Sequence, residues 1–225
     1  MDDMDGMDAG RSWTGSDGSD GVGRVDVERR SAAGVVEVRA GADGRRLVGG
    51  YAAVFGEMSE DLGGFREVIE PGFFDQVLGD DVRALWQHDN AHVLGRTLAG
   101  TLRLGVDERG LWYEAEPPAA QWAADALASI QRGDVTQSSF GFSVAEDRWE
   151  NWDGQTVRRL RRAASLFDVS PVTFPAYPQT SATVQKRAAS LRAQAEAESN
   201  GAEAASLRAR ADLLRAKINL LEVGS

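Results

Sequence analysis

The segment GDVTQSSFGFSV, residues 133–144, decides the fold class because a strand pattern begins in it directly after a helix pattern ends. Phe140, Phe142 and Val144 alternate with other residues, which is typical of a strand with one buried face. Ser139 stands at the start of this strand, where a side chain can point into a cleft. Gly141 is expected to be a bulge or a closely packed position in the strand.

The residues on either side of this segment predict one clear helix among many short strands. The helix is expected over residues 119–132, with a stop at Gly133 and an apolar stripe formed by Trp122, Ala126, Leu127 and Ile130. A second, shorter helix is predicted over residues 72–78. Elsewhere short apolar runs are separated by Gly, Asp and Pro. We therefore expect a mostly β, α+β fold built on a barrel.

The two ends of the chain differ in composition from the middle, which predicts three parts. Residues 1–31 are rich in Asp, Gly and Ser, with few large apolar side chains, so we expect a disordered acidic tail. Residues 32–183 form the folded domain. Residues 184–225 predict a helical tail that either lies on its own domain or contacts a partner as a scaffold-like or coiled-coil segment. Its heptad positions are Leu207, Leu214 and Leu221, with Ile218 between them.

The composition excludes several classes of function. The chain has 225 residues, 35 of them acidic and 25 basic, so its net charge of −10 argues against nucleic acid as a partner. It contains no cysteine, which excludes disulfides, thiolate nucleophiles and sulfur-ligated metal sites. No secretory signal or membrane-spanning stretch is apparent, so we expect a protein that works in solution inside a cell, without a membrane partner.

The chain has two histidines, and both lie in WQHDNAHVLG, residues 86–95. Histidine is the side chain best suited to move protons near neutral pH, so any acid–base mechanism is narrowly constrained. His88 follows an apolar run and is expected at the end of a strand, next to a loop, which is a common position for functional residues. A structural or surface role would also fit. His88 and His92 at i, i+4 spacing, with Asp89, could alternatively bind a metal ion, although the turn-forming residues here argue against a helix.

A serine and an aspartate complete the set of candidate residues. Ser139 is a weak nucleophile unless an imidazole lies within hydrogen-bond reach, and that imidazole needs an acceptor on its other nitrogen. Asp168 lies within the apolar strand of SLFDVSPVTFPAYP, residues 165–178. An unpaired buried carboxylate is costly, so Asp168 is expected either on the solvent face or bonded to a cation or an imidazole N–H.

Several motifs in this order resemble the prohead maturation protease family of tailed phages. QHD is followed by LGR, then by GDVTQSSFGF and LFDVSPVTFPAYP, and GYAAVFG and FREVIEPGFF fit the opening of the family. The resemblance covers about residues 48–183. It implies a β-barrel ringed by helices, similar to the herpesvirus assembly protease, and a serine endopeptidase that uses no cofactor or metal. By position in the motifs, the catalytic residues would be His88, Ser139 and Asp168.

The chain departs from the family pattern at two positions. Ser138 stands where many members have a bulky apolar residue, and Asp168 stands where many have glutamate. Since aspartate is one methylene shorter, its strand must approach His88 more closely, or another acid orients the imidazole. The alternatives are Glu67, Glu70 and Asp89.

The resemblance also implies the setting in which the enzyme acts. Its substrates would be the scaffolding segment of the major capsid protein and its own chain, inside the assembling prohead in the host cytoplasm. The site of self-cleavage would lie near the helical tail. The sequence does not specify the oligomeric state, and a homodimer is one candidate. Two rival functions are a non-catalytic capsid assembly or scaffolding module and a metal-dependent hydrolase built on His88, Asp89 and His92.

Overall fold

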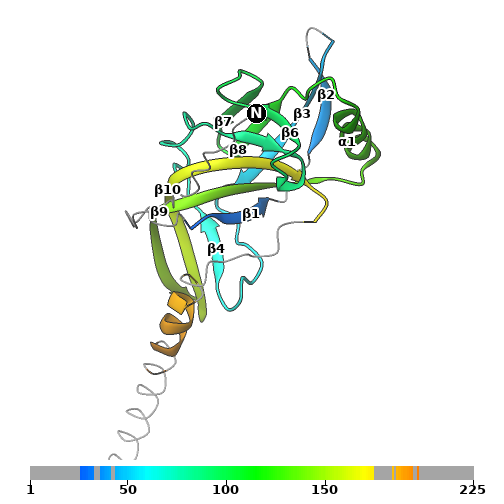
Figure 1. Ribbon diagram of the computed structural model, residues 1–225. Helices are drawn as coiled ribbons and strands as arrows, with labels where there is room; N and C mark the ends of the chain where they lie inside the picture. The colour runs from blue at the N-terminus through cyan, green and yellow to red at the C-terminus, as the bar shows by residue number, and fades with distance from the viewer. Residues whose placement is uncertain are drawn as a thin grey trace, which may run out of the picture.

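The structure is a computed structural model that describes residues 26–32, 36–41, 44–174, 184, 186–194 and 197. Two long strands form its centre (Figure 1). β9 (Gln137–Trp152) and β10 (Gln155–Val172) make a hairpin whose two-residue loop is Asp153-Gly154. Both loop residues have positive φ, 51° and 76°, as a type I′ turn requires. This turn matches the twist of the strands and sets the register next to the loop, and irregularities between Leu160 and Asp168 shift that register farther along β10.

The other strands complete two sheets. In the six-stranded sheet, β1 pairs with β9, while β4 and β5 pair with successive stretches of β10 and β6 pairs with β5. Their bounds are β1 (Glu28–Ala32), β4 (Arg66–Ile69), β5 (Arg83–Leu85) and β6 (Val93–Arg96). The four-stranded sheet has the order β2 (Glu37–Ala40), β3 (Arg46–Val54), β8 (Gly110–Ala115) and β7 (Leu102–Val106).

The hydrophobic core draws on both sheets and on the loop after β4. Phe140 and Phe142 of β9 pack against Phe73 and Phe74, with ring centroids 4.8 to 5.6 Å apart. Because successive side chains of a strand point to opposite faces, Ser139 and Gly141 lie on the other face of β9. The alternation seen in the sequence thus packs the aromatic rings into the core and presents Ser139 to the opposite side.

The expected helix is confirmed as α1 (Gln121–Arg132), which begins two residues later than predicted. Ala126, Leu127 and Ile130 are buried, and Gly133 ends the helix with a φ of 85°. The prediction of a helix over residues 72–78 was wrong, because residues 71–79 form consecutive turns. Gly72 has a φ of 90°, and the backbone bonds there join residues three apart, as from Asp75 N–H to Gly72 O.

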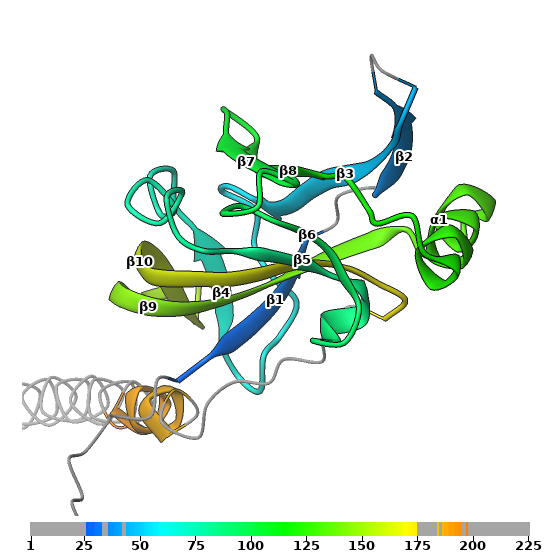
Figure 2. The same ribbon diagram turned by 45° about the horizontal axis from the view of Figure 1, so that its top comes forward.

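The fold is mixed α+β and mostly sheet, but the expectation of a closed barrel was wrong. Within the described residues the two sheets stay separate, with β1 and β6 at the ends of one and β2 and β7 at the ends of the other (Figure 2). β4 lies off this path and pairs with β10. Closure would require these edges to pair with one another, and the sheets instead pack face to face through their apolar side chains.

The end of the predicted N-terminal tail belongs to the sheet. Residues 28–31 lie in β1, because Glu28 and Arg30 are buried and make ion pairs with side chains distant in the sequence. Residues 1–25 lie outside the described residues.

Part of the predicted C-terminal tail is helical, at residues 184, 186–194 and 197. The heptad positions Leu207, Leu214 and Leu221 and Ile218 lie outside the described residues. None of the described helices has the length and apolar character needed to cross a membrane.

Candidate active site

The fold brings His88, Ser139 and Asp168 together from three elements. Ser139 lies near the start of β9, and Asp168 lies on β10 opposite Gly141. Asp168 is also paired with Arg83 of β5, and β5 leads directly into a short 3₁₀ turn, η1 (Trp86–His88). One antiparallel pairing, β9 with β10, and one parallel pairing, β10 with β5, therefore bring Ser139 and Asp168 close to His88, from which they are 51 and 80 positions away in the sequence.

The imidazole of His88 joins the other two side chains. Its Nδ1 lies 2.5 Å from Asp168 Oδ1, and its Nε2 lies 2.8 Å from Ser139 Oγ. An ionised carboxylate only accepts hydrogen bonds, so His88 Nδ1 carries the ring proton and donates a hydrogen bond to Asp168. Nε2 of the neutral ring is then an acceptor for the hydroxyl proton of Ser139. This is the arrangement in which an imidazole can act as a general base toward a serine.

Asp168 is held in place by two further features of β9 and β10. The hydroxyl of Ser170, which is fully buried, donates a hydrogen bond of 2.7 Å to Asp168 Oδ1. A Cβ atom built on Gly141 would overlap with Asp168 Oδ2. The missing side chain at position 141 therefore leaves the space in which the shorter acid reaches His88, and Gly141 is a closely packed position.

The backbone at His88 has an unusual conformation. Gln87 and His88 both have a φ of 58°, in the left-handed region that residues with a side chain rarely adopt. The amide of Gln87 secures this turn, since its Nε2 donates to Thr173 Oγ1 at 2.7 Å and its Oε1 accepts from Thr173 N–H at 3.1 Å. Strain of this kind persists only where the surroundings hold it, and it is frequent at functional sites.

None of the alternative acids contacts His88 in the structure. Glu67 pairs with Arg30 and Arg158, and Glu70 lies near Arg159 and Arg161. Asp89 accepts a hydrogen bond from His92 Nδ1 at 2.6 Å. The Ala91 N–H and the His92 ring hold the pKa of the Asp89 carboxyl below its usual range.

The two histidines therefore have different partners, although they lie four residues apart. His88 contacts Ser139 and Asp168, while His92 contacts Asp89 and packs edge-on against Trp122. In the part of the chain that the structure describes, no group of three or more His, Asp or Glu side chains could hold a metal ion.

The serine before Ser139 has its own buried partner. Ser138 Oγ lies 2.9 Å from the hydroxyl of Tyr113, and both residues are buried in the core. Burial raises the pKa of Tyr113, so its phenol stays protonated and can share this hydrogen bond. A polar side chain is thus accommodated at the position where the resemblance led us to expect an apolar one.

A buried cluster of charges lies beside the site, and it was missed by the sequence reasoning. Arg30 and Arg158 each form ion pairs with both Glu28 and Glu67, with N–O distances of 2.5 to 2.8 Å. Asp147 joins the cluster through an ion pair with Arg158. Burial opposes the charge of Arg158, but its hydrogen bonds to Glu28 and Asp147 and the charge of Glu67 raise its pKa. No signal in the sequence pairs these residues, because they are up to 130 positions apart.

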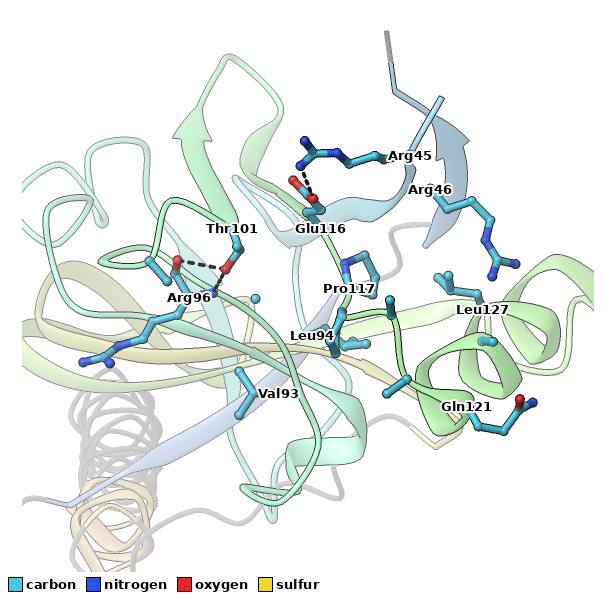
Figure 3. A pocket seen from close by; sticks show the side chains of 16 residues that line it. Arg45, Arg46, Val93, Leu94, Arg96, Thr101, Glu116, Pro117, Gln121 and Leu127 are labelled. Carbon is cyan, nitrogen blue, oxygen red and sulfur yellow. Dashed lines mark hydrogen bonds and ion pairs between the residues drawn. The ribbon is translucent and has the colours of Figure 1, made fainter. Parts of the chain in front are cut away.

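The cavity drawn in Figure 3 is lined by residues other than the candidate catalytic ones. It has a volume of about 830 Å³ and is bordered by β6, by the segment leading into α1 and by the start of β3. Arg45 on its rim pairs with Glu116, and Gln121 stands at the start of α1 (Figure 3). None of the three candidate residues lines this cavity, so its size does not mark the site of chemistry.

Comparison with known proteins agrees with the geometry. The sequence matches the family described as caudovirus prohead serine protease over residues 34–194. The prohead protease of Enterobacteria phage HK97 is 30% identical over 152 residues, which cover 67% of this chain and 65% of that relative. The chain thus spans just under two thirds of the relative's length, and no solved structure matches it. The chain belongs to the caudovirus prohead serine protease family.

Proposed function

We propose that this chain is a serine endopeptidase in which Ser139 is the nucleophile, His88 the general base and Asp168 the residue that orients His88. The observation that carries the proposal is the chain of contacts from Asp168 Oδ1 through both ring nitrogens of His88 to Ser139 Oγ, at 2.5 and 2.8 Å. Family membership supports the same reaction class.

The reaction follows from these contacts. His88 Nε2 takes the hydroxyl proton while Ser139 Oγ attacks the carbonyl carbon of a peptide bond, and Asp168 stabilises the imidazolium that forms. The C–N bond then breaks, and His88 gives the proton to the leaving amine. Water, activated by the same imidazole, hydrolyses the ester on Ser139 and restores the free enzyme.

We propose that the substrate is the scaffolding segment of the major capsid protein and that the enzyme acts inside the assembling prohead in the host cytoplasm. The name of the HK97 relative, a prohead protease, supports this setting. Cleavage of its own chain and a homodimeric state belong to the same proposal. So does a fold related to the herpesvirus assembly protease, without the closed barrel.

Two adjacent serines offer a matched test. Ser139→Ala and Ser138→Ala each remove one buried hydroxyl from β9, but the hydroxyl of Ser138 bonds to Tyr113 and not to His88. Each variant is co-expressed with the major capsid protein, and capsid-protein shortening is followed on gels. Shortening should disappear with Ser139→Ala and persist with Ser138→Ala. Equal shortening by Ser139→Ala and the wild type would instead eliminate Ser139 as the nucleophile.

A further inference from the structure

Strand β1 covers the candidate nucleophile. It lies along the edge of β9 that faces away from β10 (Figure 1). In this pairing Ser31 lies directly opposite Ser139. Ser139 is 0% exposed, and its hydroxyl donates to the backbone oxygen of Arg30 at 3.0 Å. An extended segment of the chain thus holds one of its own peptide carbonyls beside the serine.

This carbonyl competes with the general base for one proton. The hydroxyl of Ser139 has a single hydrogen, and two acceptors lie within reach of it, His88 Nε2 at 2.8 Å and Arg30 O at 3.0 Å. A hydroxyl that donates to the carbonyl is not activated by the imidazole. β1 therefore shields Ser139 from other chains and competes with His88 for its proton.

The side chain of Arg30 fills a buried acidic site. Its Nε lies 2.5 Å from Glu67 Oε2, and its guanidinium also bonds to Glu67 Oε1 at 3.0 Å and to Glu28 at 2.7 Å. Arg30 and Glu67 are 7% and 3% exposed. Two parallel bonds from a guanidinium to one carboxylate are a geometry that selects arginine, since the fork of donors matches the two oxygens.

An open cavity extends this acidic site. It has a volume of about 410 Å³ and is bordered by Arg30 and Ser31 of β1. Three carboxylates line it, those of Glu57, Glu60 and Glu67. A chain segment with basic side chains would find complementary charge here.

The strand register also places the side chains of Arg30 and Ser139 on opposite faces. Residues directly opposite each other in an antiparallel pair share a face, so Arg30 lies on the face of Phe140 and Ser31 on the face of Ser139. The Arg30 side chain is then out of the way of the serine, which meets the peptide group from the other side.

We infer that β1 occupies the substrate-binding groove of this enzyme and that Glu67 is a specificity residue, which recognises a basic side chain in an extended capsid substrate. The substrate segment takes the place of β1 at the edge of β9 by strand addition. This inference rests on the proposed endopeptidase function.

Binding of a peptide with the sequence of β1 tests the inference without any turnover. The probe is fluorescein-labelled VDVERRSAAG, which copies residues 25–34, and its matched control is VDVERQSAAG, in which glutamine replaces the residue equivalent to Arg30. All enzymes are full-length and carry Ser139→Ala. A second substitution, Arg30→Ala, loosens β1, and Arg39→Ala is the control, because Arg39 lies on β2 and forms an exposed pair.

With Arg30→Ala, the arginine peptide should bind at least tenfold more tightly than with Ser139→Ala alone or with Arg39→Ala. It should also bind at least tenfold more tightly than the glutamine peptide. Adding Glu67→Gln should abolish this preference. Equal affinity of both peptides, or a preference that survives Glu67→Gln, would overturn the inference.

Hydrogen exchange on the full-length protein with Ser139→Ala alone gives a second readout that leaves the buried charges intact. Excess arginine peptide should accelerate amide exchange in residues 28–32, because it displaces β1, and the glutamine peptide should not. Unchanged exchange with both peptides would contradict the proposed groove. Failure of the protease function itself would appear separately, as capsid-protein shortening that survives Ser139→Ala.

Discussion

Gly141 and Asp168 are partners across β9 and β10, and the Asp168 carboxylate fills the space that a side chain at position 141 would occupy. Asp168 in turn lies 2.5 Å from His88 Nδ1. The glycine between Phe140 and Phe142 is therefore part of the support of the candidate active site.

Gly141→Ala should consequently impair the reaction more than the fold. The added methyl group displaces the Asp168 carboxylate, and a misplacement of about 1 Å can cost on the order of 10²-fold in rate. The measurement is the rate of capsid-protein shortening by the purified variant. Gly79→Ala is the control, since position 79 is exposed, lacks a positive φ and has no atom within 4 Å of an added Cβ. A wild-type rate for Gly141→Ala would disprove the supporting role.

Ser170 should act as a positioning residue for Asp168. Its buried hydroxyl donates to the same oxygen that accepts from His88, so its loss leaves the carboxylate free to turn. A hydrogen bond to a charged group contributes about 1.5–3 kcal/mol. We expect Ser170→Ala to lower kcat by at least about tenfold while KM stays the same, and Ser170→Thr to restore activity.

Ser165→Ala is the matched control for Ser170, because Ser165 lies on the same strand and its hydroxyl donates to the neighbouring carbonyl of Ala164. A rise in KM with unchanged kcat for Ser170→Ala would point to a role in substrate binding instead.

The candidate site was more predictable from the sequence than its surroundings. Asp168 stands out because it interrupts an apolar strand pattern, and the two histidines leave little choice of base, while Ser139 was singled out by the resemblance to the motif of the family. The three residues contact one another because β9 and β5 both pair with β10. The barrel prediction failed because short strands alone do not specify which edges pair.

β1 was not predictable for a different reason. Residues 28–31 follow a Gly- and Asp-rich stretch, and local composition assigned them to the tail. Their place in the sheet depends on Glu67 and Arg158, which neutralise Glu28 and Arg30 over long separations in the chain. Such pairing stabilises a strand without leaving a periodic pattern in the sequence.

The turn at Gln87 should control the position of His88. Gln87 and Thr173 bond to each other twice, and this contact holds two consecutive residues at a φ of 58°. Gln87→Ala removes both bonds and should lower the rate of capsid-protein shortening by about tenfold, corresponding to about 1.4 kcal/mol. Thr173→Val removes one of the bonds and should have a smaller effect of the same kind.

The double variant of Gln87 and Thr173 distinguishes a shared contact from two independent effects. If the contact holds His88, adding Thr173→Val to Gln87→Ala should cause no further loss, because the bond is already absent. Losses that multiply would show that the two residues act separately.

Arg158 should be essential for the stability of the sheet. Its side chain is 3% exposed and lies 2.8 Å from the carboxylates of Glu28 and Glu67. Removing one member of a buried charge cluster leaves the others without compensation, which typically costs about 3–5 kcal/mol. We therefore expect Arg158→Met, which keeps much of the volume, to lower the free energy of unfolding by this amount in urea titrations.

Arg161 on the same strand is the control for this measurement, because its side chain is 50% exposed and its ion pairs with Glu146 and Glu70 are open to solvent. Exposed pairs contribute about 0–1 kcal/mol, so Arg161→Met should leave the unfolding midpoint almost unchanged. If both variants unfold at the same urea concentration, the buried cluster adds no more stability than a surface pair. The attachment of β1 would then depend on its backbone hydrogen bonds to β9 and not on the charges of Glu28 and Arg30.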